Sequence, residues 1–141
     1  MKAGIQTFLS EAGDAACYAL DIVQIASRHI GRDIDPIYAL DRGIAARMIH
    51  YSWANTDDND NFFVTDPAGL LTLLTGDVWT VEKVGPDYVA SVGEHVVERW
   101  ERQVTGSTIG HFRLPDWDSL VDSKTVRFGA IVSKRVFRRK R

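Results

Sequence analysis

The segment SEAGDAACYALDIVQIASRHIG, residues 10–31, carries the only cysteine of the chain, Cys17, at the point where a helix is predicted to begin. From residue 17 to residue 30 the apolar side chains recur at the helical period. Asp14 before this stretch and Gly31 after it are typical start and stop signals. A helix N-terminus favours a thiolate over a thiol. The position of Cys17 therefore fits a nucleophile, and it equally fits a small buried residue.

Two more helices are predicted from Asp-Pro pairs, in which the aspartate caps the helix and the proline takes its first position. Asp35 and Pro36 open the second helix, and Asp66 and Pro67 open a third, short helix that ends at Gly76. The apolar face expected for the second helix consists of Ile37, Leu40, Ile44 and Met48.

After residue 76 the pattern changes to alternating strands. Residues 78–84 alternate and are rich in β-branched side chains, which predicts a strand. Residues 96–104 and 108–115 flank Gly106 as the two arms of a hairpin, and residues 130–137 form a final strand. Helices followed by antiparallel strands predict an α+β fold.

The length of 141 residues predicts one domain over residues 1–141, helical to about residue 76 and sheet from about residue 77 to residue 138. The 45% hydrophobic and 26% charged residues are typical of a soluble globular protein. No apolar run is long enough to cross a bilayer, so no membrane partner is expected. One cysteine excludes an internal disulfide, and we expect a cytoplasmic protein. The sequence gives no indication of the oligomeric state.

The charges are unevenly distributed along the chain. From Ser123 to Arg141 there are eight Lys or Arg residues and no acidic residue. The first 122 residues hold the other nine basic residues and all nineteen acidic ones. A basic end of this kind can bind nucleic acid or a membrane surface. The alternative is a last strand with a solvated basic end, which is the interpretation that we favour.

A lone cysteine on the first helix, with histidines and acids among later strands, is the layout of papain-like cysteine peptidases. His29 and His50 are assigned to helix C-termini, where a positive charge is favourable. His95 can lead a strand and is the reserve candidate for the catalytic base. His111 is the preferred candidate, because it follows a glycine and its strand runs directly into two carboxylates.

The segment GHFRLPDWDSLVDSKTVRFGAIVSKRVFRR, residues 110–139, resembles the C-terminal signature of a little-characterised family found in phages, prophage-bearing bacteria and spirochaetes. FLSEAGDAACYAL, residues 8–20, is similar to the start of that family's cysteine-bearing helix. The family is similar to papain-like peptidases, close to the leader-peptide peptidases of bacteriocin exporters. The positions that match its C-terminal signature are His111-Phe112, Asp118-Ser119, Ser123-Lys124-Thr125-Val126, Gly129 and Ser133-Lys134-Arg135-Val136-Phe137.

The resemblance implies a triad in which Cys17 attacks, His111 exchanges the proton, and Asp118 orients the imidazole. Because Pro115 and Asp116 form the turn after His111, Asp116 is an alternative orienting group. Trp117 lies between two acidic residues and close to His111 in the sequence, so we expect it at the rim of a cleft.

Papain-like enzymes place a glutamine about six residues before the cysteine, where it helps to bind the oxyanion. Glu11 occupies that position here, and Gln6 is the only glutamine upstream of Cys17. The identity of the oxyanion side chain therefore stays open between these two.

We expect a cysteine peptidase or amidase that cleaves a peptide or isopeptide bond in a peptide or protein substrate, in phage biology. The alternative is a catalytically inactive binding protein on the same fold, whose basic tail contacts nucleic acid. No metal-ligand spacing and no glycine-rich nucleotide loop is present in the sequence, so neither a metal nor a cofactor is expected.

Overall fold

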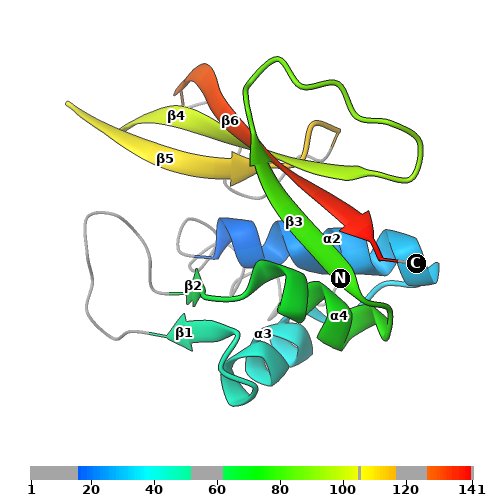
Figure 1. Ribbon diagram of the computed structural model, residues 1–141. Helices are drawn as coiled ribbons and strands as arrows, with labels where there is room; N and C mark the ends of the chain where they lie inside the picture. Colours follow the sequence, from blue (N-terminus) through cyan, green and yellow to red (C-terminus); the bar gives the residue numbers. More distant parts are fainter. Residues whose placement is uncertain (1–15, 52–61, 105, 117–126, 141) are drawn as a thin grey trace.

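The computed structural model describes residues 16–51, 62–104, 106–116 and 127–140, and in these residues helices and antiparallel sheets form an α+β fold, as predicted (Figure 1). Asp14 lies outside the described residues. The elements are α2 (Cys17–Ile30), α3 (Pro36–Ala45), β1 (Ile49–Tyr51), β2 (Phe62–Val64), α4 (Pro67–Thr75), β3 (Trp79–Val84), β4 (His95–Val104), β5 (Ser107–Arg113) and β6 (Arg127–Arg139).

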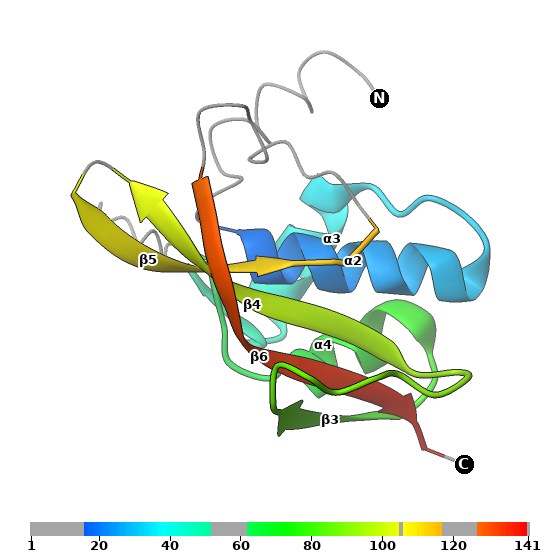
Figure 2. The ribbon, with the colours of Figure 1, turned by 90° about the horizontal axis from the view of Figure 1, so that it is seen from above.

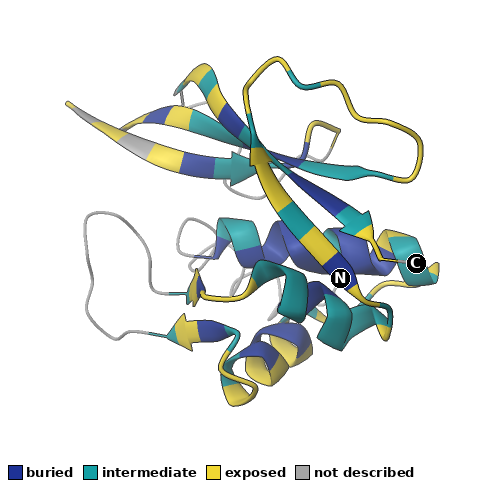
Figure 3. Cartoon of the chain, in the orientation of Figure 1, coloured by how far each residue is buried: buried dark blue, intermediate teal, exposed yellow. Residues whose placement is uncertain are grey.

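Helix α2 is the central element and has the predicted bounds. It lies between a four-stranded sheet on one side and α3, α4, β1 and β2 on the other (Figure 1). A helix that is enclosed by other elements on several sides must be apolar on most of its surface. Between residues 19 and 27 only Gln24 is not buried (Figure 3). The helix ends at Gly31, whose φ of 78° is the left-handed conformation that glycine adopts without strain.

Both Asp-Pro pairs open helices, as the sequence predicts. The Asp35 carboxylate accepts a hydrogen bond from the Ile37 N–H at 3.0 Å. At the start of α4, the Asp66 carboxylate accepts one from the Gly69 N–H at 2.9 Å. These bonds satisfy N–H groups that have no partner within the helix.

The region after α3 differs from the sequence-based expectation. Helix α3 ends at Ala45, so Met48 lies beyond it, and the side chain of Ile37 is exposed. His50 does not end a helix but lies in β1, which pairs with β2. The physical reason is tertiary pairing, because Ile49 is buried opposite Val64, which lies fifteen residues later in the chain.

The larger sheet is antiparallel with the order β3-β6-β4-β5 (Figure 2). Strands β4 and β5 form the predicted hairpin, in which Gly106 has a φ of 79°. Strand β6 comes last in the sequence but is central in the sheet, since it pairs with both β3 and β4. The pairing of β4 with β6 shifts register on both sides of Trp100, which bends the sheet there.

The hydrophobic core lies between α2 and the face of the large sheet that covers it, and it extends to α4 and β1 (Figure 3). The largest fully buried apolar side chains are Phe137, Ile22, Ile25, Leu70 and Leu71. The predicted nucleophile, Cys17, lies at the start of α2 between Ala16, which belongs to this core, and Tyr18, which packs against it.

Candidate functional site

Cys17 is the first residue of α2, and it lies against strand β5. Its pKa is raised to about 12, chiefly because burial disfavours the thiolate. The negative charge of Asp21, one turn further along the helix, raises it as well. Hydrogen bonds with the backbone at Phe112 and Tyr18, and the charge of Arg99, lower the pKa but do not compensate. The surroundings of Cys17 therefore raise the pKa of the thiol rather than lower it.

The side chain of Phe112 is the centre of a cluster that joins α2 to the sheet. The Tyr18 ring stacks on the Phe112 ring, with centroids 4.0 Å apart and planes 12° apart. The guanidinium groups of Arg99 and Arg135 lie 4.6 Å and 5.1 Å from the centroid of the same ring. Contacts of this kind between a cation and an aromatic face are attractive. We call Tyr18, Arg99, Phe112 and Arg135 the Phe112 cluster.

Two buried polar residues, Asp21 and Ser133, border the Phe112 cluster. Asp21 is 1% exposed and lies one turn after Cys17 on the same helix. Burial raises the pKa of Tyr18, and the charge of Arg135 opposes that shift. Arg135 itself donates a hydrogen bond to the Ser133 hydroxyl. The start of α2 is thus surrounded by charged and aromatic groups.

His111 is buried in β5, but its imidazole faces away from α2. Neighbouring residues of a strand point to opposite faces, and Phe112 faces the helix. On the other face, the His111 ring lies 5.4 Å from the Phe128 ring, and His111 is paired in register with Trp100. Cys17 is therefore close to the backbone that follows His111, while the imidazole lies on the far side of the sheet.

The glycine before His111 has a different neighbour from the one expected. A glycine at position 110 allows another backbone or a substrate to approach closely, which is why the sequence favoured His111. In the structure the Arg99 guanidinium lies there, and a side chain at position 110 would collide with it. The glycine thus makes room for a member of the Phe112 cluster.

His95, the reserve candidate, begins β4 as predicted but lies near the other end of α2. Its ring is 5.7 Å from the Trp79 ring. Burial lowers its pKa, and the charges of His29 and Arg28 lower it further. These two residues are in the last turn of α2, about 18 Å along the axis from Cys17. His95 is therefore not placed to take a proton from that thiol.

Asp116, the alternative orienting group, forms an ion pair with Arg28 at the surface. One of its carboxylate oxygens lies 2.9 Å from Nη1 of Arg28, and its side chain is 70% exposed. Arg28 belongs to the last turn of α2, so this ion pair is remote from Cys17. Four candidates from the sequence lie outside the described residues, namely Gln6, Glu11, Trp117 and Asp118.

Two basic residues of β6, Arg138 and Arg139, have acidic partners. Arg138 contacts Glu94 at 2.5 Å and Glu82 at 2.6 Å. Arg139 lies 4.0 Å from the Asp77 carboxylate. The sequence predicts a final strand over residues 130–137 with a solvated basic end. The structure confirms the strand, extends it over residues 127–139 and places it in the centre of the sheet.

Sequence reasoning missed the Phe112 cluster. Arg135 alternates with Ser133 and Phe137, a pattern that places all three on one face of β6. This alternation signalled a strand, but it did not show which aromatic ring the arginine would meet.

Within the described residues, no group of three His, Cys, Asp or Glu side chains is arranged to hold a metal ion. In the same part of the chain, no helix has the length and apolar character required to span a bilayer. Comparison of the chain with protein-family models, with curated proteins and with solved structures gives no match in any of the three.

Proposed function

We propose that this chain is a non-catalytic binding protein built on a papain-like scaffold. The observation that carries the proposal is the arrangement around Cys17. The thiol lies at the start of α2 with a raised pKa, and the imidazole of His111 faces the other side of the sheet. A thiol peptidase needs a thiolate and a base within hydrogen-bond reach.

The papain-like part of the proposal is supported by the order and packing of the elements. A helix that opens with cysteine packs across an antiparallel sheet formed entirely by later segments. Helix α2 contacts both β5 and β4, the two strands that carry the candidate histidines. This order agrees with the resemblance of the N-terminal and C-terminal segments to the phage and spirochaete family.

The direction of the pKa shift favours binding over catalysis. Because the pKa of Cys17 is raised, a smaller fraction of this thiol is ionised at neutral pH than the few per cent of an unperturbed cysteine. A nearby base would have to offset this deficit. His111 and His95 are the two candidates for that base, and neither imidazole faces the thiol.

An active cysteine peptidase or amidase is the second candidate, and one contact favours it. The Cys17 thiol is hydrogen-bonded to the backbone at Phe112, the residue that directly follows His111. In this candidate Cys17 attacks the carbonyl carbon to form a thioester, and His111 transfers the thiol proton to the leaving amine. Water then hydrolyses the thioester, with Asp118 or Asp116 orienting the imidazole. The arrangement requires His111 to turn to the α2 face.

Alkylation of Cys17 by iodoacetamide, measured against pH, separates the two candidates. For the binding protein we expect labelling of the folded chain at neutral pH to be at least about 100-fold slower than in urea. The rate should keep rising with pH above the free cysteine value of about 8.5. The Cys17→Ala variant is the control for labelling at other groups.

The His111→Ala variant sharpens this experiment. If the chain is a binding protein, Cys17 should be labelled at the same rate in this variant as in the wild type, because the imidazole does not activate the thiol. Fast labelling of the folded chain with an inflection below pH 8.5, abolished in His111→Ala, would replace the binding proposal with the peptidase.

A further inference from the structure

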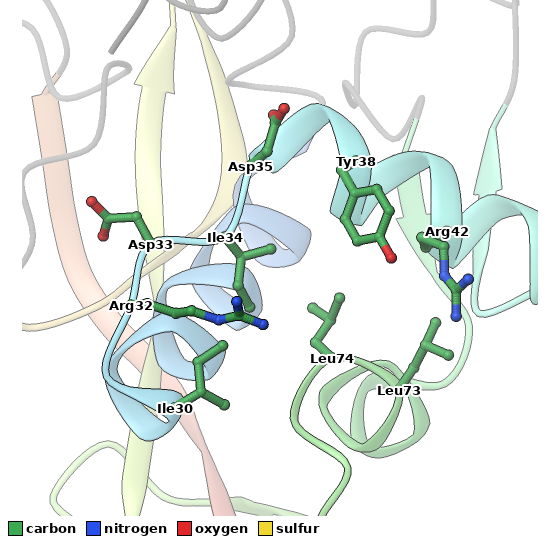
Figure 4. Close-up of a pocket in the computed structure, with 9 residues that line it drawn as sticks. All are labelled: Ile30, Arg32, Asp33, Ile34, Asp35, Tyr38, Arg42, Leu73 and Leu74. Carbon is green, nitrogen blue, oxygen red and sulfur yellow. The ribbon is translucent and has the colours of Figure 1, made fainter.

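A pocket of about 300 Å³ opens between α3, α4 and the connection from α2 to α3, far from the start of α2 (Figure 4). This volume is at the lower end of the range of ligand-binding pockets. The pocket has an apolar part, formed by Ile30, Ile34, Leu73 and Leu74, and a polar part, formed by Arg32, Asp33, Asp35, Tyr38 and Arg42.

The two arginines give the pocket its charge. In Figure 4 the side chains of Arg32 and Arg42 lie on opposite sides of the pocket, with the Tyr38 hydroxyl between them. Neither arginine forms an ion pair with another described residue. Arg42 lies over the Tyr38 ring at 5.9 Å from its centroid, which restricts the guanidinium without neutralising it. Both guanidinium groups can therefore accept a new anionic partner.

The two aspartates do not neutralise this site. In Figure 4 the carboxylates of Asp33 and Asp35 point away from the pocket. The Asp35 carboxylate already accepts the hydrogen bond that caps α3. The positive groups thus face the pocket and the negative groups face the solvent around it.

The Tyr38 side chain, which lines the pocket from α3, is 56% exposed. Arginine and tyrosine are enriched in the energetically important part of protein interfaces.

We propose that this pocket binds a segment of a partner protein in which an apolar side chain is followed by a carboxylate. The apolar side chain would pack between Ile34 and Leu74, and the carboxylate would lie between Arg32 and Arg42. The inference rests on the proposed binding function. A nucleic acid is a poorer fit, because its row of phosphates would also meet Asp33, Asp35 and the apolar side chains.

Two immobilised libraries of short peptides test the proposal with the full-length chain. One library has a fixed central Leu-Glu pair with random flanking residues, and the matched library has Leu-Gln in the same place. We expect retention on the Leu-Glu library to exceed retention on the Leu-Gln library by about tenfold, because only the carboxylate forms charge-assisted hydrogen bonds with arginine. Equal retention on both libraries, or no retention on either, would overturn the proposal.

Variants link the binding to the pocket. Arg32→Gln and Arg42→Gln should each reduce retention on the Leu-Glu library by about tenfold. Lys83→Gln removes a charge from an exposed position on β3 outside the pocket, and it should leave retention unchanged. Equal losses in all three variants would show a general charge effect and contradict the pocket site.

Two competitors test the class of ligand. Decanoate offers an apolar chain with a carboxylate but no peptide backbone, and a single-stranded oligonucleotide offers phosphates. If either displaces the peptides completely and binds the chain on its own through Arg32 and Arg42, the partner-segment proposal is wrong. The outcome is independent of the thiol experiment. Rapid alkylation of Cys17 would overturn the proposed function but not binding at the pocket. Equal retention on the two libraries would overturn binding at the pocket but not the proposed function.

Discussion

Phe112 lies where the side chains of three elements meet, since Tyr18 of α2 stacks on its ring and Arg99 and Arg135 flank it from β4 and β6. Burial lowers the pKa of Arg135, and the like charge of Arg99 lowers it further. The aromatic ring between them offsets part of this repulsion. Phe112 therefore holds two arginines near the start of α2 that would otherwise repel each other.

Removing this ring should destabilise the fold strongly. We expect Phe112→Ala to lower the free energy of unfolding by about 3 kcal/mol, because it deletes the stack on Tyr18 and the contacts of both arginines. Phe63→Ala is the matched control, since Phe63 is 53% exposed on β2, and it should cost below about 1 kcal/mol. Urea unfolding measures both values. Equal losses in the two variants would show that the cluster has no special role.

The sequence predicted the helix that begins at Cys17, but it did not predict which side chains of β5 face that helix. Helical periodicity and Gly31 gave the bounds of α2 correctly. Alternation in β5 implies that His111 and Phe112 face opposite sides. Which of the two faces α2 depends on how the sheet packs, and no local pattern contains that information.

At the scale of elements, residues 85–94 connect β3 to β4 and are bound to β6 through Glu94. The Glu94 carboxylate accepts hydrogen bonds from the Tyr88 hydroxyl at 2.6 Å, the Ser91 N–H at 2.7 Å and Nε of Arg138 at 2.5 Å. These bonds lower the pKa of Glu94 to about 2, and the bond from Tyr88 has the largest effect, followed by those from Ser91 and Arg138. Lys134 adds a hydrogen bond to the Tyr88 carbonyl. The connection is thus attached to the sheet by one carboxylate with three donors.

This attachment should make the stability depend on pH in the acidic range. Because the folded pKa of about 2 is below the unfolded value of about 4.3, the stabilisation is complete above pH 4.3 and is lost as the pH falls towards 2. We expect Glu94→Gln to be less stable than the wild type at neutral pH and to lose less stability on acidification. Urea midpoints measured down to about pH 3 test this.

Glu101→Gln is the control for that experiment. Glu101 is exposed on β4 and lies outside the contacts of Glu94. Its variant should follow the wild-type dependence on pH. If Glu94→Gln also follows the wild type, the carboxylate does not hold the connection to β6.

The elements that the sequence predicted are those with local signals. Asp35 and Asp66 cap α3 and α4, and Gly76 ends α4 in the left-handed conformation. Strands β1 and β2 were missed because each has only three residues and is stabilised by pairing with a distant segment. A strand of this length has too few positions to show alternation.

At the scale of the whole molecule, the basic C-terminal segment is integrated in the sheet. Strand β6 pairs with β3 and β4, and Glu82 and Glu94 bind Arg138. The acidic residues of the first 122 positions thus provide partners for the basic end. The sequence showed the uneven distribution of charge, but only the fold shows that the two halves of this distribution are in contact.

We therefore expect any nucleic-acid binding by this chain to be weak and independent of its last two residues. Lys140 is exposed at the end of the described chain, and replacing Lys140 and Arg141 by glutamine removes basic charge without breaking the ion pairs of Arg138. DNA and RNA binding of this double variant and of the wild type should be equal at low and at high salt. If the basic end bound nucleic acid, the logarithm of the binding constant would fall with the logarithm of the salt concentration, with a slope of roughly 0.9 per neutralised phosphate. The double variant would then lose up to two phosphate contacts, and the slope would decrease by roughly 0.9 for each. Tight wild-type binding whose salt dependence falls in the variant would assign the basic end to nucleic acid, despite its acidic partners in the sheet.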